Sequence, residues 1–338
     1  MHQLSQDLSA FLQAQANRGV SDLHLEAVNN GYRWRCRFLG ELSAPPEQQQ
    51  LLSEHEGLRI IAALKTAAGL DTTERRLPQD GRIQITASTG CIDCRLNSIA
   101  TLRGEKLVLR LQLTHQQALP LTELGMLPQQ LQQAESALQL QEGLILVTGP
   151  TGSGKTRTLY AMLQILAAQT KNIATVEDPV EVALAGVNQV PIKPAIGLTF
   201  ATALRALLRQ DPDVLMVGEI RDAETAHIAV QAAQTGHLVF ATLHASAALN
   251  AIIRLQQLGI DNYQLATCLQ LLINQRLITV AKQRQGVFQL HAMHEQLRQA
   301  LLAGPSQANY WQQLRQCLQH TEVSSLSEFT DSVRLSEQ

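Results

Sequence analysis

The sequence Gly-Pro-Thr-Gly-Ser-Gly-Lys-Thr at residues 149–156 decides the fold, because it fits the pattern G-x-x-x-x-G-K-[ST]. Residues 144–148 before it are apolar and predict a buried strand, and residues 158–169 after it are rich in residue types that favour a helix. A strand, a glycine-rich loop and a helix in this order form a P-loop, in which backbone N–H groups and the helix N-terminus face phosphates. We therefore predict a nucleoside triphosphate site.

The expected roles within this loop follow from side-chain chemistry. The ammonium group of Lys155 supplies a positive charge for the phosphates, and the hydroxyl of Thr156 can hold Mg²⁺. The glycines allow the backbone to turn its N–H groups inward. The residues expected to contact the nucleotide are Gly149, Pro150, Thr151, Gly152, Ser153, Gly154, Lys155, Thr156 and Arg157.

The composition argues against several classes of function. Lys and Arg total 27 and Asp and Glu total 29, a net charge of −2, so there is no electrostatic case for nucleic acid as the main partner. Aromatic residues, at 4%, are too few for base-stacking platforms. No signal peptide and no long apolar run is visible, so we expect a cytoplasmic protein without a membrane span. The five scattered cysteines, including the lone pair Cys91 and Cys94, favour reduced thiols over a zinc site.

Changes in the apolar pattern divide the chain into four parts. Residues 1–115 combine a helical pattern with period-two segments, which predicts a small α+β domain. Residues 116–125 are expected to form a linker. Helices and apolar strands alternate over residues 126–283, which predicts an α/β P-loop domain with a parallel sheet. Residues 284–338 predict a helical region, with its first helix over residues 289–303 and a disordered tail.

Three apolar segments of the P-loop domain end in polar residues, namely Glu177, Glu219 and His244. Because the C-terminal ends of parallel strands meet at one edge of the sheet, these side chains are expected near the phosphates. ATP hydrolysis needs a carboxylate that orients water, and Glu219 is the best candidate. Glu177 could assist with Mg²⁺ or water. His244 could sense the γ-phosphate, although a lone histidine is more often structural.

Further motifs in the chain resemble those of the type II and type IV secretion and pilus ATPases, the group of GspE, PilB and PilT. The resemblance extends over most of the chain. The matching segments, besides the P-loop, are Ser-Asp-Leu-His-Leu-Glu (21–26), Glu-Arg-Arg-Leu-Pro-Gln-Asp-Gly-Arg (74–82), Gly-Glu-Lys-Leu-Val-Leu-Arg (104–110), Val-Glu-Asp-Pro-Val-Glu (176–181), Leu-Arg-Gln-Asp-Pro-Asp (208–213), Gly-Glu-Ile-Arg-Asp (218–222) and Thr-Gly-His-Leu-Val-Phe-Ala-Thr-Leu-His (235–244).

The resemblance implies a RecA-like P-loop core, a smaller PAS-like α+β domain before it and a helical segment after it. It implies that Glu219 is the catalytic glutamate, that Glu177 is its acidic partner, and that His244 belongs to the family's histidine box. Members of the family form hexameric rings in which the N-terminal domain supplies arginine fingers. The matching residues here are Arg82 and Arg95, and a guanidinium group suits a phosphate.

The resemblance also implies a function. The chain would use ATP and Mg²⁺ as a homohexameric motor that powers assembly of a type IV pilus, a pseudopilus or a type II secretion system. Its partners would be a polytopic inner-membrane platform protein and the pilus or secretion machinery, with no nucleic acid. It would be cytoplasmic and only peripherally associated with the inner membrane. Two alternatives stay open: a pilus retraction ATPase, and a nucleotide-gated scaffold with little hydrolysis.

Some features depart from the family pattern. Arg157 stands where the family has Thr, directly after the P-loop. The chain starts close to the segment 21–26, whereas many assembly ATPases carry a further N-terminal docking domain. No four-cysteine module follows Leu277. We therefore expect a shortened form that holds no zinc, similar in layout to the competence-pseudopilus ATPases.

Overall fold

The computed structural model describes residues 4–48, 50–87, 90–114, 119–280, 283–305, 309–320 and 323–324. Contacts divide the chain into two compact units, residues 1–116 and 117–338, and hydrophobic clusters fill each of them. Among the residues so described, no helix is both long and apolar enough to cross a membrane. The tail that the sequence predicts to be disordered lies outside them from residue 325 onward.

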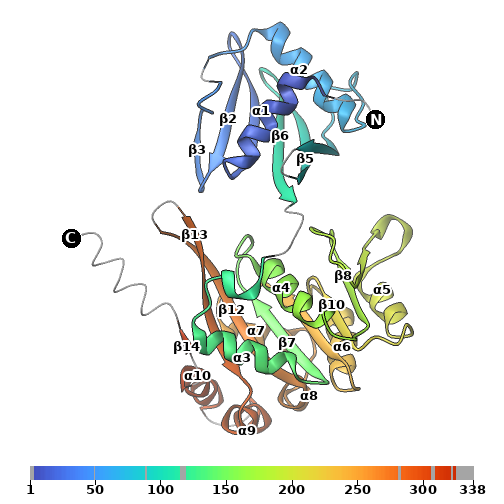
Figure 1. The fold of residues 1–338 in the computed structure, drawn as a ribbon, viewed down its shortest axis with the longest axis vertical. Helices are drawn as coiled ribbons and strands as arrows, with labels where there is room; N and C mark the ends of the chain where they lie inside the picture. Colours follow the sequence, from blue (N-terminus) through green and yellow to red (C-terminus); the bar gives the residue numbers. More distant parts are fainter. Residues whose placement is uncertain are drawn as a thin grey trace, which may run out of the picture. The chain divides into compact units, whose positions relative to one another are not determined.

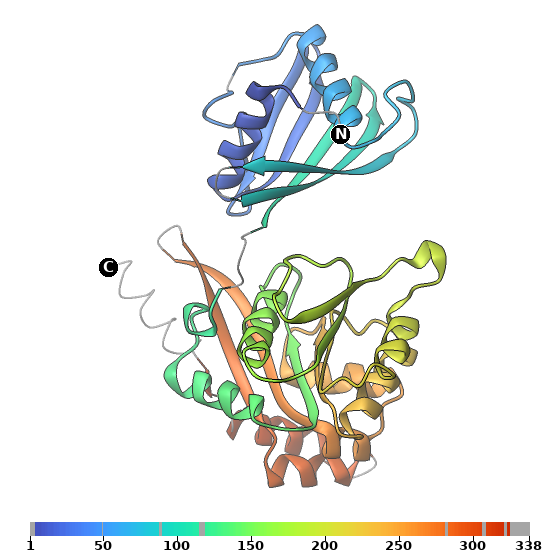
Figure 2. The same ribbon diagram turned by 45° about the vertical axis from the view of Figure 1, so that its right-hand side comes forward.

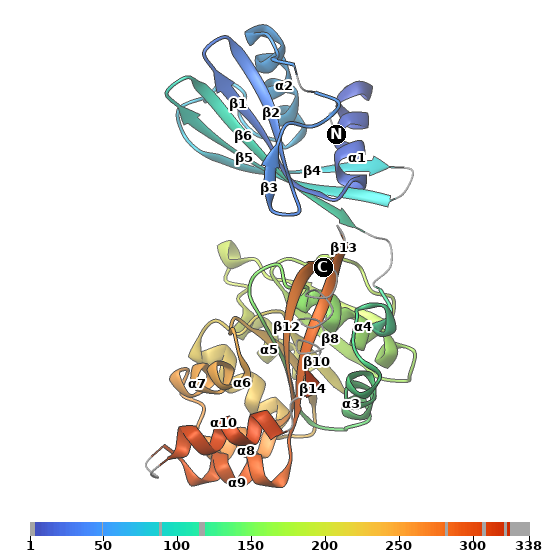
Figure 3. The same cartoon turned by 90° about the vertical axis from the view of Figure 1, so that its left-hand side faces the viewer.

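The first unit is a six-stranded antiparallel sheet with two helices (Figures 1 and 3). The strands lie in the order β3-β2-β1-β6-β5-β4. In chain order the elements are α1 (Gln6–Asn17), β1 (Val20–Val28), β2 (Gly31–Phe38), β3 (Glu41–Ser43), α2 (Glu54–Ala67), β4 (Gln79–Ala87), β5 (Gly90–Thr101) and β6 (Gly104–Thr114).

Period-two alternation explains which face of this sheet is buried. In β1, Leu23 and Leu25 are buried against the helices, while His24 between them points to the other face. The capping box of Ser53 and Glu56 fixes the start of α2. One hydrophobic cluster joins both helices to the strands, so both cover the same face of the sheet. The residues that alternate with the buried ones lie on the opposite face.

The second unit is an eight-stranded sheet in the order β14-β13-β12-β7-β11-β10-β8-β9. The strands from β12 to β9 in this order are parallel, and β13 is antiparallel to both of its neighbours, β12 and β14. The elements are η1 (Leu121–Glu123), α3 (Pro128–Leu138), β7 (Gly143–Thr148), α4 (Lys155–Ala167), β8 (Ile173–Glu177), β9 (Val187–Pro191), η2 (Pro194–Ile196), α5 (Phe200–Leu207), β10 (Val214–Val217), α6 (Ala223–Ala233), β11 (Leu238–Leu243), α7 (Ala248–Gln257), α8 (Asn262–Cys268), β12 (Leu269–Val280), β13 (Gln283–Ala292), α9 (Glu295–Ala303), α10 (Tyr310–His320) and β14 (Val323–Ser324).

Helices cover both faces of this sheet. Helices α3 and α4 pack on one face, and α5, α6 and α7 pack on the other (Figure 3). The central strands are buried on both sides, which is why β7 is an unbroken apolar run from Leu144 to Val147. Helices α8, α9 and α10, drawn in orange and red in Figure 2, lie together at the edge where the parallel strands begin. The opposite edge, where these strands end, is left for the site.

One sequence expectation about the C-terminal region is wrong. The predicted helix over residues 289–303 begins only at Glu295, because residues up to Ala292 belong to β13. In that strand Phe288 and Leu290 are buried against β12. The strand is long and its partner is close in sequence, so the hairpin overrides the local preference of this Gln- and Leu-rich segment for a helix.

Candidate active site

The P-loop joins β7 to α4, as the sequence predicts. Gly149 (φ +151°) and Gly154 (φ +89°) have backbone conformations that other residues rarely adopt. A Cβ atom at Gly149 would lie 2.2 Å from the backbone oxygen of Gln275, and one at Gly154 would lie 2.9 Å from the side-chain nitrogen of the same residue. These glycines therefore serve two needs, the turn itself and the close approach of β12.

Lys155 begins α4 and bends back onto the loop. Its Nζ atom donates hydrogen bonds to the backbone oxygens of Gly149 and Pro150, both at 2.9 Å. Burial lowers the pKa of the Lys155 ammonium group, and the carboxylate of Glu219 acts in the opposite direction. A phosphate would offer this ammonium group a charged acceptor in place of the two backbone oxygens.

The loop fits a phosphate ligand by two further observations. The Ser153 hydroxyl is buried and has no hydrogen-bond partner among the described residues, so an acceptor oxygen can use it. The helix that follows has no acidic residue in its first turn and no side-chain cap, so its N–H groups face the loop. The loop also forms one wall of a pocket of about 400 Å³, lined by Gly149, Pro150, Thr151, Gly152, Ser153, His244, Ala245, Ser246, Arg276 and Leu277.

Strand register explains why distant residues line this pocket. Thr148, the last residue of β7, is paired with Leu243 of β11 on one side and with Asn274 of β12 on the other. The chain that continues beyond these two partners therefore flanks the P-loop. His244 follows Leu243, and Arg276 lies two residues after Asn274.

The candidate catalytic glutamate lies at the same edge of the sheet. Strand β10 lies between β8 and β11, and Glu219 follows it by two residues. The Oε1 atom of Glu219 is 3.1 Å from Nε2 of His244, and its Oε2 atom accepts a hydrogen bond of 2.7 Å from Nε of Arg221. The structure thus brings Glu219 and His244 into contact, as expected from their places at the ends of neighbouring strands.

Glu177 lies at the end of β8 but turns into the protein. It is only 2% exposed, and its carboxylate accepts hydrogen bonds from the hydroxyls of Tyr160 and Thr175 and from the amide of Gln189. Burial and the neighbouring carboxylate of Glu177 raise the pKa of Tyr160, so that hydroxyl stays a donor. All three partners of Glu177 are neutral.

Magnesium fits this loop without a dedicated cluster of ligands. Over the described ranges, no group of three or more His, Cys, Asp or Glu residues could hold a metal ion. Magnesium in nucleotide sites keeps several waters and takes phosphate oxygens, so it needs few protein ligands. Thr156 is half-buried, and its hydroxyl would hold the magnesium ion, as the P-loop pattern predicts.

The two candidate arginine fingers lie side by side in the first unit. Arg82 of β4 is directly opposite Arg95 of β5, and Arg95 is directly opposite Arg110 of β6. Arg82 is bonded to Asp93 through two nitrogens, and Nε of Arg110 donates to Asp22 at 2.9 Å. Three guanidinium groups thus form a row across three strands on the exposed face, although like charges in such positions destabilise a sheet.

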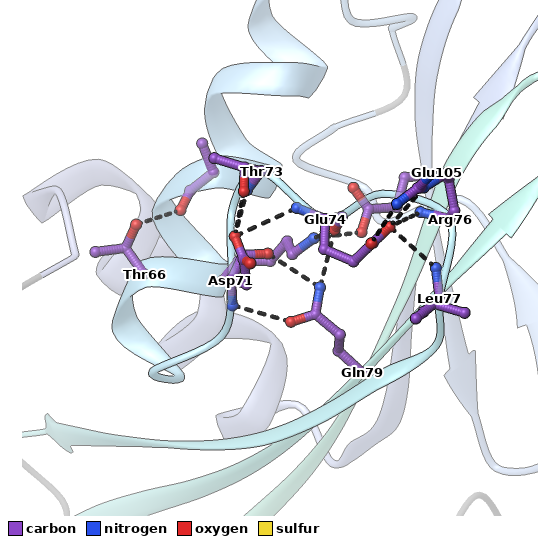
Figure 4. A network of polar contacts seen from close by, with 10 residues as sticks. Thr66, Asp71, Thr73, Glu74, Arg76, Leu77, Gln79 and Glu105 are labelled. Carbon is purple, nitrogen blue, oxygen red and sulfur yellow. Dashed lines mark hydrogen bonds and ion pairs between the residues drawn. The ribbon is translucent and has the colours of Figure 1, made fainter.

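A network of polar contacts holds the segment that leads into β4 (Figure 4). Asp71 accepts hydrogen bonds from Thr73, and the side chain of Gln79 bonds to the backbone of both Asp71 and Glu74. Beneath it, the fully buried Lys65 donates to the backbone oxygen of Glu74 at 2.7 Å and to Oε1 of Glu105 at 2.8 Å. These contacts fix the start of the strand that carries Arg82.

Comparison with known proteins agrees with this geometry. The family described as "Type II/IV secretion system protein" matches residues 2–331. The chain belongs to this family. The resemblance in the sequence motifs is thereby confirmed.

Individual members of the secretion family are similar over most of this chain. The "Protein transport protein HofB homolog" of Escherichia coli is 48% identical over 271 residues, 80% of this chain and 58% of that protein. The "Type IV pilus assembly ATPase PilB" of Pseudomonas aeruginosa is 50% identical over 263 residues, 77% of this chain and 45% of that protein. The chain therefore spans about half the length of these relatives.

A solved structure confirms the fold of this secretion family member. The structure titled "Crystal Structure of the Pilus Retraction Motor PilT and Bound ADP" superposes with a TM-score of 0.70 at 28% identity, covering 93% of this chain and 90% of that one. The predicted α/β fold, a RecA-like P-loop core with a smaller N-terminal domain, is therefore correct.

Several residues at the site of this secretion family member were not expected from the sequence. Arg221 lies in the motif at residues 218–222, and it contacts Glu219. Arg276 lines the pocket. Gln275 is buried, and its Oε1 atom accepts a hydrogen bond of 2.7 Å from the Thr158 hydroxyl. Only the segment Asn-Gln-Arg-Leu at 274–277, polar residues within an otherwise apolar strand, could have pointed to the last two.

Proposed function

We propose that this chain is the ATP-hydrolysing part of a motor that powers assembly of a type IV pilus, a pseudopilus or a type II secretion system. The observation that carries this proposal is the position of Glu219. It lies at the C-terminal edge of the sheet that bears the P-loop, and it contacts His244, which lines the same pocket. Such an edge is where P-loop proteins place the group that orients water.

Each residue has a distinct role in the proposed reaction. Residues 149–154 and Lys155 bind the phosphates, and the Arg157 side chain adds a cation beside them. Glu219 orients water and accepts its proton as the oxygen attacks the γ-phosphorus and the bond to the β-phosphate oxygen breaks. His244 contacts the γ-phosphate through its exposed ring. Thr156, with Glu177 as the acidic partner, would hold Mg²⁺, which would supply positive charge for the phosphates.

The N-terminal unit supplies the remaining positive charge in this proposal. Arg82 and Arg95 approach the phosphates of a nucleotide and stabilise the charge that develops in the transition state. Their pairing on adjacent strands supports this role, because it places two guanidinium groups side by side. The motor works as a homohexamer at the inner membrane, bound peripherally to a polytopic platform protein.

A steady-state ATPase assay tests the enzymatic part. We expect Mg²⁺-dependent turnover that Glu219→Gln abolishes while binding of a non-hydrolysable ATP analogue is kept. Lys155→Ala should lose both binding and turnover, because it removes the charge that the phosphates need. Binding without turnover in the unmodified protein would instead favour a nucleotide-gated scaffold, the alternative that the extra cation Arg157 suggests.

The direction of the motor requires a cellular test. The chain is 50% identical to a type IV pilus assembly ATPase, which favours assembly. It is 28% identical to the pilus retraction motor of known structure, so retraction is the second candidate. Deletion of the gene followed by a count of surface pili separates the two. Loss of pili means assembly, and an excess of pili means retraction.

A further inference from the structure

Both oxygens of the Glu219 carboxylate already have a side-chain partner in this structure. Oε1 lies 3.1 Å from Nε2 of His244. Oε2 accepts a hydrogen bond of 2.7 Å from Nε of Arg221 and forms an ion pair with Nη2 of the same residue, also at 2.7 Å. A carboxylate that activates water must accept a hydrogen bond from that water and then its proton. The guanidinium group of Arg221 therefore competes with water for this carboxylate.

Arg221 has a second carboxylate within reach. Its Nη1 atom is 3.3 Å from Oδ2 of Asp178, which follows β8 on the neighbouring strand. The backbone register of β10 and β8 pairs Val217 with Val176, so Glu219 and Asp178 lie level with each other just beyond the strand ends. One guanidinium group thus lies between two carboxylates.

Exposure shows which of these groups can move. The Arg221 side chain is 55% exposed and Asp178 is 42% exposed, whereas Glu219 is only 18% exposed. An exposed guanidinium group can change partners at little cost, since exposed ion pairs are weak. A shift of Arg221 fully onto Asp178 would keep the cation paired and would leave Oε2 of Glu219 open.

We propose that Arg221 is a positioning residue that holds Glu219 inactive and releases it by moving onto Asp178 before water is activated. The proposal rests on the role of Glu219 given above. Asp178 is the alternative partner that makes release possible. His244 remains on the other oxygen and keeps the carboxylate oriented.

Single-turnover hydrolysis of bound ATP by the full chain tests this proposal, because product release then does not mask the chemical step. Arg221→Gln should raise the single-turnover rate about two- to fivefold, the gain expected when a weak competing ion pair is removed. The affinity for ADP should stay unchanged. Arg221→Lys keeps the charge without the fork of nitrogens and should give an intermediate rate.

Arg205→Gln is the matched control. Arg205 forms an ion pair of 2.7 Å with Glu224, and its side chain is 50% exposed, similar to that of Arg221. The substitution makes the same change in net charge away from Glu219 and should leave the rate unchanged. An Arg221→Gln rate equal to that of the control, or below that of the unmodified protein, would overturn the proposal.

Asp178→Asn tests the second half of the proposal. Without this carboxylate Arg221 should stay on Glu219, so the single-turnover rate should fall. In the Arg221→Gln background the same substitution should have no effect, because no guanidinium group is then present to pair with residue 178. An equal effect of Asp178→Asn in both backgrounds contradicts the exchange between two carboxylates.

Failure of the proposed function has a different signature. The unmodified protein would then neither bind an ATP analogue nor hydrolyse ATP, and Lys155→Ala would behave like it. The proposed role of Arg221 would then be overturned together with the proposed function. A protein that hydrolyses ATP at a rate indifferent to Arg221 overturns the inference alone.

Discussion

Glu177 and Glu219 end neighbouring strands of one sheet, yet they lie in different surroundings. Glu177 is buried and accepts hydrogen bonds from three neutral groups. Glu219 is partly exposed and contacts His244 and Arg221. A carboxylate fixed among buried donors is bound in one arrangement, whereas one with exposed partners can exchange them. The position of an acid at a strand end therefore does not decide its role, whereas its partners do.

Two cations on α4 show the same contrast. Lys155 is buried and its ammonium group bonds to the loop, whereas Arg157, two residues later, is exposed. Residues two positions apart project from different sides of a helix, and Arg157 is not among the residues that line the pocket beside the loop. The buried cation is built into the loop, and the exposed one is free to contact a ligand.

The largest effect should separate the two glutamates in catalysis. Glu219→Gln should lower kcat by about 10²- to 10⁴-fold, the range for loss of a general base. Glu177→Gln should lower it by only about tenfold, as expected for a group that acts on the metal through neighbours. Steady-state assays at saturating ATP and Mg²⁺ measure both. Equal losses would remove the distinction between the two acids.

A smaller effect should appear in stability when the buried network is cut. Tyr160→Phe removes a hydroxyl that donates to Glu177 and accepts from the backbone N–H of Glu181. Leaving these buried groups short of a partner should lower the free energy of unfolding by about 1–3 kcal/mol, measured by urea denaturation. The control is Tyr263→Phe, at a tyrosine that is 66% exposed, which should change little. An unchanged Tyr160→Phe protein would mean that the network does not hold Glu177.

The smallest effect should come from the exposed cation on α4. Arg157→Thr, the residue that the family prefers, should weaken binding of ADP and of an ATP analogue about two- to fivefold, because one charge near a helix N-terminus is worth little in water. The difference should shrink in high salt. Arg157→Lys keeps the charge and should bind almost as the unmodified protein does. Tighter binding by the Thr variant would show that Arg157 obstructs the nucleotide.

Local patterns in the sequence were sufficient for the centre of the site. The P-loop, the apolar strands and the residues that follow them predicted that Glu219 and His244 would lie at one edge of a parallel sheet. A strand that is buried on both sides is apolar throughout and ends where polar residues begin, so its end is visible in the sequence. The direction in which Glu177 turns is not visible, because it depends on Tyr160 and Gln189 from other elements.

Non-local pairing explains what the sequence did not predict. Gln275 and Arg276 reach the P-loop only because β12 pairs with β7, more than a hundred residues earlier in the chain. The hairpin with β12 draws residues 289–292 into β13 instead of a helix. Sequence periodicity describes each element by itself, whereas strand order decides which elements meet.

The buried pair of Lys65 and Glu105 limits how this protein can evolve. Each charge is removed from water and relies on the other, so a substitution of either one alone would leave its partner unpaired in the core. Such a step would cost about 3–5 kcal/mol, a large share of the stability of a small domain. Descendants of this sequence can therefore change the two positions only together, and the motif that contains Glu105 is tied to a helix forty residues upstream.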